Sequence, residues 1–201
     1  MGGKPPGAGD RRVRRTRRAL QDALLALILE RGWDGFSVQD LCERADVGRS
    51  TFYTHFADKE EVVTSGLEEL GRDLRAQLAG SGAARPLGFS RGLIEHAHGH
   101  LRVFRALVGR RSGHLVQGKM RELVHQLVQE DLAGLLPPGA RRDGAAAFLA
   151  GAFFELLFWS LQARHAPTAE EADALFQEFA LPVLAAARLP AGSARDRAGG
   201  R

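Results

Sequence analysis

The chain of 201 residues predicts an all-α fold, with a short helix-turn-helix segment near its start and a helical bundle after it. Three observations favour this fold. Apolar residues recur every three or four positions along most of the chain, which is the period of an amphipathic helix. No segment has the alternation of apolar and polar residues that is typical of a strand. Glycine and proline clusters, such as Gly80-Ser81-Gly82 and Pro137-Pro138-Gly139, separate the periodic segments.

The composition is that of a protein that folds in water, because 44% of the residues are hydrophobic and no long stretch lacks charge. The net charge is only +4, but arginines gather at the start of the chain. They are Arg11, Arg12, Arg14, Arg15, Arg17 and Arg18. This cluster, expected ahead of the first helix, predicts attraction to phosphates, and a solubilising tail is the alternative. The polar, Gly/Pro-rich start has no apolar secretion segment, so we expect a cytoplasmic protein.

The first predicted helix carries one apolar stripe and ends at Gly32. The stripe consists of Leu20, Ala23, Leu24, Leu27 and Ile28. Ser37 then has the chemistry of an N-cap, because its oxygen is able to accept from the backbone N–H of Asp40. A second helix is predicted over 38–45, with Leu41, Cys42 and Ala45 buried. Cys42 is the single cysteine, which excludes an internal disulfide, and we expect a small core residue there.

A tight turn, Asp46-Val47-Gly48, leads into a third helix predicted over 49–56. Aspartate tolerates the left-handed backbone that such a turn needs. Phe52 and Phe56 lie at i and i+4 and are predicted to face the core. The remaining faces carry side chains that hydrogen bond. A solvated helical hairpin is the alternative interpretation of this pattern.

Asp58 and Glu61 predict a capping box at the start of a fourth helix. Lys59 lies in its first turn, where we expect it to meet a phosphate. The helix continues along a stripe of Val63, Leu67, Leu70, Leu74 and Leu78 and is predicted to link the two halves of the chain.

The segment DLCERADVGRSTFYTHFADKEEVV, residues 40–63, resembles the tetracycline-repressor (TetR) family of bacterial transcription regulators. The resemblance covers about residues 15–63 and is most specific in STFYTHFADKE, with GWDGFSVQDLCERADV also in register. The family usually has Gly where Asp46 stands and a capping residue where Gly48 stands. The turn and the cap of the third helix are therefore expected to differ from the usual pattern.

The resemblance implies a set of DNA-contacting residues, with the third helix in the major groove. The set is Ser37, Arg49, Ser50, Thr51, Tyr53, Thr54, His55 and Lys59. Tyr53, His55 and Lys59 are expected on phosphates more often than on bases. The alternative for His55 is a histidine stabilised by the dipole at a helix C-terminus.

Four further helices are predicted after the linking helix. One, over 87–108, has the stripe Phe89, Leu93, Ala97, Leu101, Phe104 and Val108. Another, over 115–136, has the stripe Met120, Leu123, Val124, Leu127, Val128 and Leu132. The third, over 140–164, is apolar on nearly every face, so both of its sides need a covering partner. The last, over 168–188, has the stripe Ala172, Leu175, Phe176 and Phe179, and Pro182 is expected to bend or shorten it.

The last two helices, about 140–188, predict a homodimer interface. Ala147, Gly151 and Ala152 permit close approach, and a second set supplies contact area: Phe148, Phe154, Phe158 and Trp159. The resemblance supports this assignment, because TetR-like proteins associate through their last two long helices. A plain buried core helix is the alternative. A two-fold dimer implies a pseudo-palindromic operator.

The second half is expected, from the resemblance, to bind a small-molecule effector that shifts the linking helix. The candidate lining residues are Phe104, Val108, Met120, Phe153 and Phe158, and ordinary core packing is the alternative for each. His96 and His100 have a spacing that suits a metal, with His98 between them. No accompanying motif supports a metal, and a polar helix shoulder is the preferred interpretation.

The predicted organisation has four parts: a disordered basic arm over 1–12, a helix-turn-helix domain over 13–60, an effector-binding and dimerisation domain over 61–188, and a disordered tail over 189–201. We expect a transcriptional regulator, a repressor in type, with double-stranded DNA and an effector as partners and no membrane. No catalytic or cofactor motif occurs, so an enzyme is not expected. The alternatives are a nucleoid-type DNA-coating protein and a histidine-based metal hydrolase.

Overall fold

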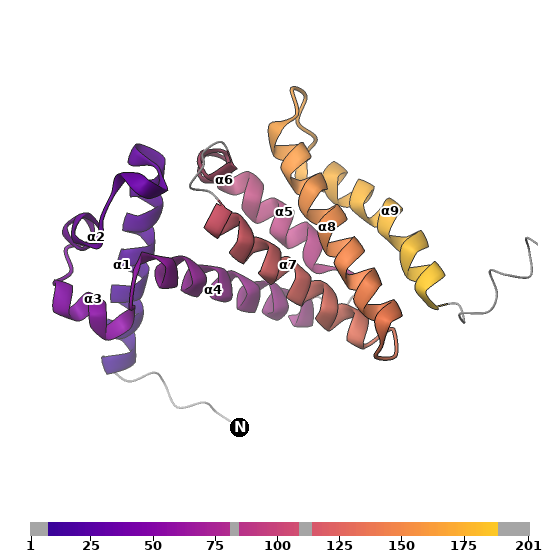
Figure 1. Ribbon diagram of the computed structural model, residues 1–201, viewed down its shortest axis with the longest axis horizontal. Helices are drawn as coiled ribbons and strands as arrows, with labels where there is room; N and C mark the ends of the chain where they lie inside the picture. The colour runs from indigo at the N-terminus through magenta and orange to yellow at the C-terminus, as the bar shows by residue number, and fades with distance from the viewer. Residues whose placement is uncertain (1–7, 81–84, 109–113, 189–201) are drawn as a thin grey trace, which may run out of the picture. The chain divides into compact units, whose positions relative to one another are not determined.

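The computed structural model describes residues 8–80, 85–108 and 114–188, and every regular element in these ranges is helical. The elements are α1 (Ala8–Arg31), the 3-10 turn η1 (Trp33–Gly35), α2 (Val38–Ala45), α3 (Arg49–His55), α4 (Lys59–Gly80), α5 (Phe89–Gly99), α6 (Leu101–Val108), α7 (His114–Ala133), α8 (Ala140–Gln162) and α9 (Ala169–Arg188). Figure 1 follows them in chain order. The predicted all-α fold is confirmed.

The chain packs as two compact units. The N-terminal unit contains the chain up to Arg72 together with 100–120, and the C-terminal unit contains 73–99 and the chain from Arg121 onward. The boundary thus falls inside α4, whereas the sequence-based domain boundary lies at residues 60 and 61. Both α4 and α7 contribute residues to each unit.

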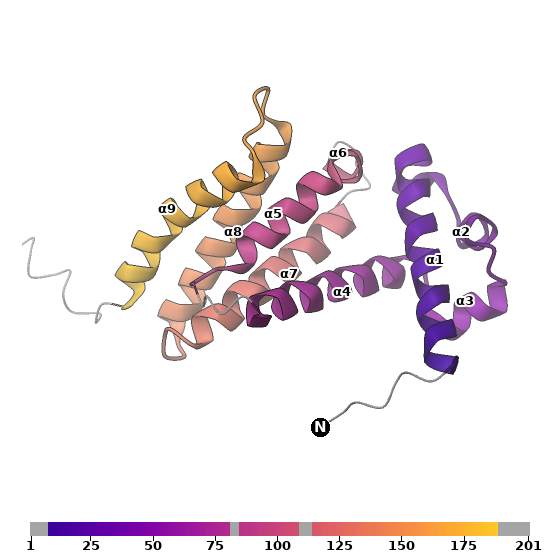
Figure 2. The same cartoon turned by 180° about the vertical axis from the view of Figure 1, so that it is seen from behind.

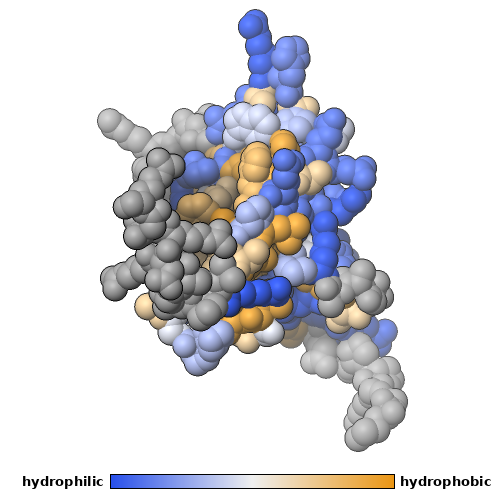
Figure 3. All heavy atoms as spheres, turned by 90° about the vertical axis from the view of Figure 1, so that its right-hand side faces the viewer, coloured by the Kyte–Doolittle hydropathy of each residue, from blue (hydrophilic) through white to orange (hydrophobic). Residues whose placement is uncertain are grey.

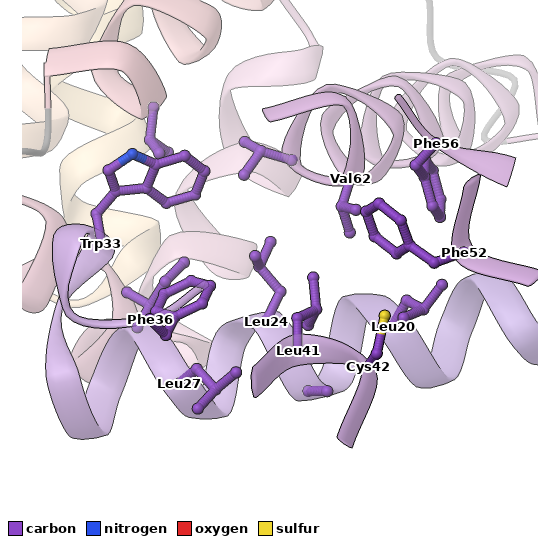
Figure 4. Close-up of a cluster of buried hydrophobic side chains, with 14 residues drawn as sticks. Leu20, Leu24, Leu27, Trp33, Phe36, Leu41, Cys42, Phe52, Phe56 and Val62 are labelled. Atoms are coloured by element: carbon purple, nitrogen blue, oxygen red, sulfur yellow. The ribbon is translucent and has the colours of Figure 1, made fainter. Parts of the chain in front are cut away.

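The core of the N-terminal unit joins α1, α2 and α3. The predicted stripe of α1 is buried in full: Leu20, Ala23, Leu24, Leu27 and Ile28. In Figure 4 Leu24 of α1 lies near Leu41 of α2, Leu20 lies near Phe52, and Leu27 lies near Phe36. Val116, from the first turns of α7, joins the same cluster, which the sequence pattern did not reveal.

Local capping interactions and a left-handed turn residue set the bounds of the helices in the helix-turn-helix. Ser37 Oγ accepts from Asp40 N at 3.2 Å and Ser37 N donates to Asp40 Oδ2 at 2.8 Å, which makes a capping box for α2. Asp46 has a φ of 53°, the left-handed conformation expected of it. Gly48 is the N-cap of α3; its φ of −62° is ordinary, and no side chain caps the helix. Phe52 and Phe56 are buried as predicted.

Two predicted helix boundaries are wrong. The arginines from Arg11 to Arg18 lie within α1, which begins at Ala8, and not ahead of it. Arginine is a good helix former, and a continuous run of such residues extends the helix toward the N-terminus. The predicted helix over 87–108 is divided into α5 and α6 after Gly99, because glycine is a poor helix former. His100 O then accepts from the N–H groups of Val103 and Phe104 to start α6.

The core of the C-terminal unit is centred on aromatic rings from α5, α8 and α9. The ring of Phe153 lies edge-on to Phe89 at 5.4 Å and to Phe176 at 4.9 Å, measured between centroids. Both ribbon views show α8 and α9 side by side (Figures 1 and 2). The predicted stripe of α7 is also buried: Met120, Leu123, Val124, Leu127, Val128 and Leu132.

A buried polar network fastens the start of α5 to α9. Asp173 is 3% exposed and accepts from Ser90 Oγ at 2.5 Å and from Arg85 Nη2 at 2.6 Å. Gln177 Nε2 donates to Ser90 Oγ at 3.0 Å and to Leu87 O at 3.1 Å. Leu87 is fully buried with a φ of 57°, a conformation that costs free energy in a residue with a Cβ. The network therefore holds this turn in place.

Large apolar side chains of α8 and α9 remain exposed. Phe148 and Phe179 are each 61% exposed and Trp159 is 52% exposed. Figure 3 shows the side on which α9 lies in Figure 1, where hydrophobic side chains gather between hydrophilic ones. α8 is long and apolar enough to cross a membrane, but the core helix of a soluble bundle has the same properties, and α8 packs against α9 and α5. Pro182 lies inside α9, which continues to Arg188, so it does not end the helix early.

Several predicted features lie outside the described residues. They are the first seven residues of the arm, the stop at residues 81–82, the side chain of Val108 and the tail over 189–201.

Candidate nucleic-acid interface

The outer face of α3 is built almost entirely from groups that hydrogen bond. Phe52 points into the core. Ser50 and Thr54 are two residues before and after it, so both lie on nearly the opposite side of a helix with 3.6 residues per turn. Both are exposed, as are Thr51 and Tyr53. The buried phenylalanine therefore sets which side chains α3 presents to a partner.

Tyr53 combines an anchored ring with an accessible edge. Its ring lies at 88° to that of Phe52, with 5.3 Å between centroids, and the residue is 52% exposed. The guanidinium carbon of Arg49, one turn earlier, lies 5.9 Å from the Tyr53 centroid. Thr54 Oγ1 donates to Ser50 O at 2.9 Å, which leaves its oxygen free to accept. The side chains on this face are thus partly oriented before any ligand binds.

Two predicted contact residues are already bound inside the protein. Ser37 is exposed, but its hydroxyl belongs to the capping box of α2. Lys59 is half-buried, and its Nζ donates to Trp33 O at 2.8 Å and to Phe36 O at 3.0 Å. His55, the last residue of α3, is half-buried next to the Phe56 ring. The structure therefore brings the predicted residues together along α3 but engages Ser37 and Lys59 elsewhere.

Arginines extend the polar surface onto α1. Arg11, Arg14, Arg15 and Arg18 are exposed and share one side of the helix, opposite the buried stripe. Arg17 turns inward instead. Its guanidinium carbon lies 4.9 Å from the Phe56 centroid, and Nη2 donates to Ser65 Oγ at 3.3 Å. Arg17 thus joins α1 to Phe56, the residue after α3, and to α4.

The carboxyl group of Asp40, at the start of α2, has a lowered pKa. Hydrogen bonds from the Ser37 hydroxyl and the Ser37 N–H, with a further one from Arg31, hold the pKa of this carboxyl well below its usual range. Arg31 Nη1 donates to Asp40 Oδ1 at 2.7 Å.

Burial raises the pKa of the Cys42 thiol, so this cysteine stays protonated, as suits a core residue.

The predicted effector-lining residues fall in both units. Phe104 and Met120 are buried in the N-terminal unit, whereas Phe153 and Phe158 belong to the C-terminal unit. Phe153 is a core residue at 0% exposure, and the Phe158 ring lies 4.3 Å from that of Phe154. These residues therefore do not form one cluster within a unit.

The three histidines of 96–100 do not form a metal cluster in the described parts of the chain, where no group of three metal-ligating side chains occurs. His98 Nε2 is buried without a hydrogen-bond partner. His96 and His98 lie on α5, and His100 lies between α5 and α6.

Comparison with known proteins identifies the family. The sequence profile of bacterial regulatory proteins of the tetR family matches residues 20–65, which include α2, α3 and the start of α4. The transcriptional regulator TcmR of Streptomyces glaucescens is 34% identical over 141 residues, or 69% of this chain and 58% of TcmR. The chain belongs to the TetR family. The match spans less than two thirds of the length of TcmR.

Solved structures of TetR proteins share the fold. A regulator from Streptococcus agalactiae superposes with a TM-score of 0.62 and 24% identity, and the match covers 86% of this chain and 97% of that one. RolR, solved with the ligand resorcinol, superposes with a TM-score of 0.54 and 20% identity over 95% of this chain and 96% of that one. The likeness therefore includes the helical bundle as well as the helix-turn-helix.

Proposed function

We propose that the protein is a transcriptional repressor that binds a pseudo-palindromic DNA operator as a homodimer and releases it on binding a small molecule. The observation that carries the proposal is the face of α3 opposite Phe52, where Ser50, Thr51, Tyr53 and Thr54 are exposed together. Such side chains recognise base edges and phosphates in a major groove. TetR membership supports the same interpretation.

The proposed DNA contacts are Arg49, Ser50, Thr51, Tyr53, Thr54 and His55. Ser50, Thr51 and Thr54 are assigned to base edges because their short side chains point away from the core. Arg49, Tyr53 and His55 are assigned to phosphates, which fix the orientation of the helix. The exposed arginines of α1 add phosphate attraction without sequence recognition. Ser37 and Lys59 are omitted, because internal hydrogen bonds engage both.

The homodimer is supported by the apolar surface of α8 and α9. Each of three large apolar side chains exposes more than half of its surface: Phe148, Trp159 and Phe179. A monomer would leave this apolar area in contact with water, whereas a dimer would bury it. A Cβ added to Gly151 of α8 would meet no atom within 4 Å, so a second helix has room to approach there. A two-fold dimer would place two α3 helices in major grooves about 34–36 Å apart.

Release by an effector is supported by the likeness to RolR, whose structure contains resorcinol. We assign the binding region to the aromatic side chains around Phe153 and Phe158, because rings stack on small aromatic molecules. Phe104, Val108 and Met120 stay sequence-based predictions. A panel of phenols tests the assignment: a true effector raises the melting temperature and lowers operator affinity, and Phe158→Ala removes both effects.

Selection of bound fragments from genomic DNA tests the operator proposal. We expect a recurring inverted repeat, and Tyr53→Ala should weaken binding to every sequence by a similar factor. Thr51→Ala should instead relax preference at one position by about 1–3 kcal/mol. Tyr53→Phe is the matched control, because it keeps the ring against Phe52 and removes only the hydroxyl. Equal recovery of all fragments would support a DNA-coating protein in place of a repressor.

Repression has a simple physical basis in this proposal, because a dimer that covers a promoter excludes the polymerase. Deletion of the gene should raise transcription of the genes beside the selected operators, and a fall in their transcription would identify an activator. We place the protein in the cytoplasm, where its DNA partner is found.

A further inference from the structure

The ammonium group of Lys59 lies between two carbonyl oxygens and two aromatic rings. Nζ donates to Trp33 O at 2.8 Å and to Phe36 O at 3.0 Å. The same atom lies 4.7 Å from the Trp33 ring centroid and 4.6 Å from that of Phe36. Both rings are buried and meet edge to face, with 6.1 Å between centroids. We call these four groups the lysine cup.

The lysine cup connects the start of α4 to the segment between α1 and α2. η1 is only three residues long, so few of its carbonyl groups have helical partners. Hydrogen bonds from a charged donor to these oxygens are stronger than neutral ones, and the aromatic faces add cation–π attraction. Phe36 directly precedes Ser37, the N-cap of α2. Lys59 therefore fixes the point at which the helix-turn-helix begins.

The charges around Lys59 disfavour a phosphate at the same place. Asp58 precedes it and Glu60 and Glu61 follow it, all three exposed. Asp58 Oδ1 accepts from Glu61 N at 2.8 Å, and Glu61 Oε2 accepts from Ala57 N at 2.6 Å, so the N-terminus of α4 already has anionic caps. A phosphate approaching this turn would meet like charge.

We propose that Lys59 is a positioning residue for DNA binding, which holds α2 and α3 in register with the first turn of α4 rather than contacting a phosphate. The proposal rests on the proposed function. Because the lysine cup ties the two segments together, a displacement of the first turn of α4 moves the start of α2 with it. Lys59 acts on DNA only through α2 and α3.

The test measures operator affinity against salt concentration for Lys59→Met and Lys59→Arg. A lost phosphate contact reduces the slope of log affinity against log salt by about 0.9 per protomer. We expect Lys59→Met to lower affinity about tenfold with an unchanged slope. We expect Lys59→Arg to lose affinity as well, because a planar guanidinium does not match the two oxygens and two rings that hold an ammonium. Arg49→Met is the comparison, since its loss should reduce the slope.

Hydrogen exchange of the free protein gives a readout that does not depend on DNA. Lys59→Met should accelerate exchange at the first amides of α2, including Leu41, and leave the α1 core near Leu27 protected. A reduced salt slope with full binding by Lys59→Arg would identify a phosphate contact and overturn the proposal, as would unchanged affinity in both variants. If the wild-type protein binds no duplex, the proposed function fails, and exchange still tests the lysine cup.

Discussion

The outer face of α3 and the outer faces of α8 and α9 differ in chemistry, although all three helices are anchored by buried phenylalanines. α3 exposes hydroxyl groups, and its one exposed aromatic residue, Tyr53, also carries a hydroxyl. α8 and α9 instead expose Phe148, Trp159 and Phe179. The first surface suits a hydrated, charged partner such as a duplex, and the second suits another apolar surface. In the function we propose, the N-terminal unit therefore recognises DNA and the C-terminal unit associates with a second copy of the chain.

Alanine at the central phenylalanine of each unit should have the largest effect. Phe52→Ala and Phe153→Ala each remove a ring with no exposed surface, and each should lower the free energy of unfolding by about 3–5 kcal/mol. If the two units unfold separately, each substitution lowers one thermal transition and leaves the other in place. Calorimetry measures both transitions. A single transition lowered equally by both variants would mean that the units unfold together.

Helix bounds and turn conformations that depend on neighbouring residues can be predicted from the sequence. The bounds of α2 are predicted correctly because Ser37 and Asp40 are three residues apart and cap one another. Asp46 takes the left-handed backbone for an equally local reason, the tolerance of its short polar side chain. Helix periodicity likewise identifies the buried side of α7. Features set by neighbours in the chain are therefore recovered well.

The features of the fold and of the site that the sequence does not predict depend on contacts between segments far apart in the chain. Lys59 binds carbonyl groups 23 and 26 residues away, and a lysine in the first turn of a helix has no sequence signal for that partner. Val116 joins a core whose other members lie before residue 64. The break after Gly99 is predictable only in part, because glycine lowers helix stability without requiring a break. Pairing across the chain is the information that a periodic pattern lacks.

A charge on the exposed face of α8 should disrupt the proposed dimer interface and leave the outer face of α3 unchanged. Trp159→Glu places a carboxylate where we propose a second copy of the chain, so we expect a monomer by sedimentation. Because the two half-sites are then no longer linked, operator affinity should fall by about a hundredfold or more. Trp159→Phe is the control and should stay dimeric. A dimer that persists in Trp159→Glu would exclude this face as the interface.

The capping carboxylates of the two units give a matched test of pH dependence. Hydrogen bonds from Ser37 and Arg31 lower the pKa of Asp40 in the N-terminal unit, and hydrogen bonds from the N–H and hydroxyl of Thr168 lower the pKa of Glu171 in the C-terminal unit. A lowered folded-state pKa stabilises the fold above the unfolded value, about 4 for both groups, and this stabilisation is lost as pH falls through the folded value.

Thermal unfolding followed from pH 6 to pH 2 measures this loss. Asp40→Asn should reduce the acid dependence of the N-terminal unit, and Glu171→Gln should reduce that of the C-terminal unit. Each variant serves as the control for the other. If both variants change the same transition, the two capping carboxylates do not report on separate units.

The smallest expected effect concerns Gly48, which departs from the usual family pattern at the start of α3. Its φ of −62° and ψ of 143° suit any residue, and an added Cβ would meet nothing closer than Thr51 Oγ1 at 3.9 Å. Gly48→Ser supplies an oxygen that accepts from the backbone N–H of Thr51 and reduces the freedom of the unfolded chain, so it should stabilise the protein by about 0.5–1 kcal/mol. Asp46→Ala is the contrasting variant: with a φ of 53° at that position, it should destabilise the turn. Urea unfolding of the N-terminal unit measures both. If Gly48→Ser leaves the midpoint unchanged, α3 is held by Phe52 and Phe56 alone, and the missing cap has no cost in this fold.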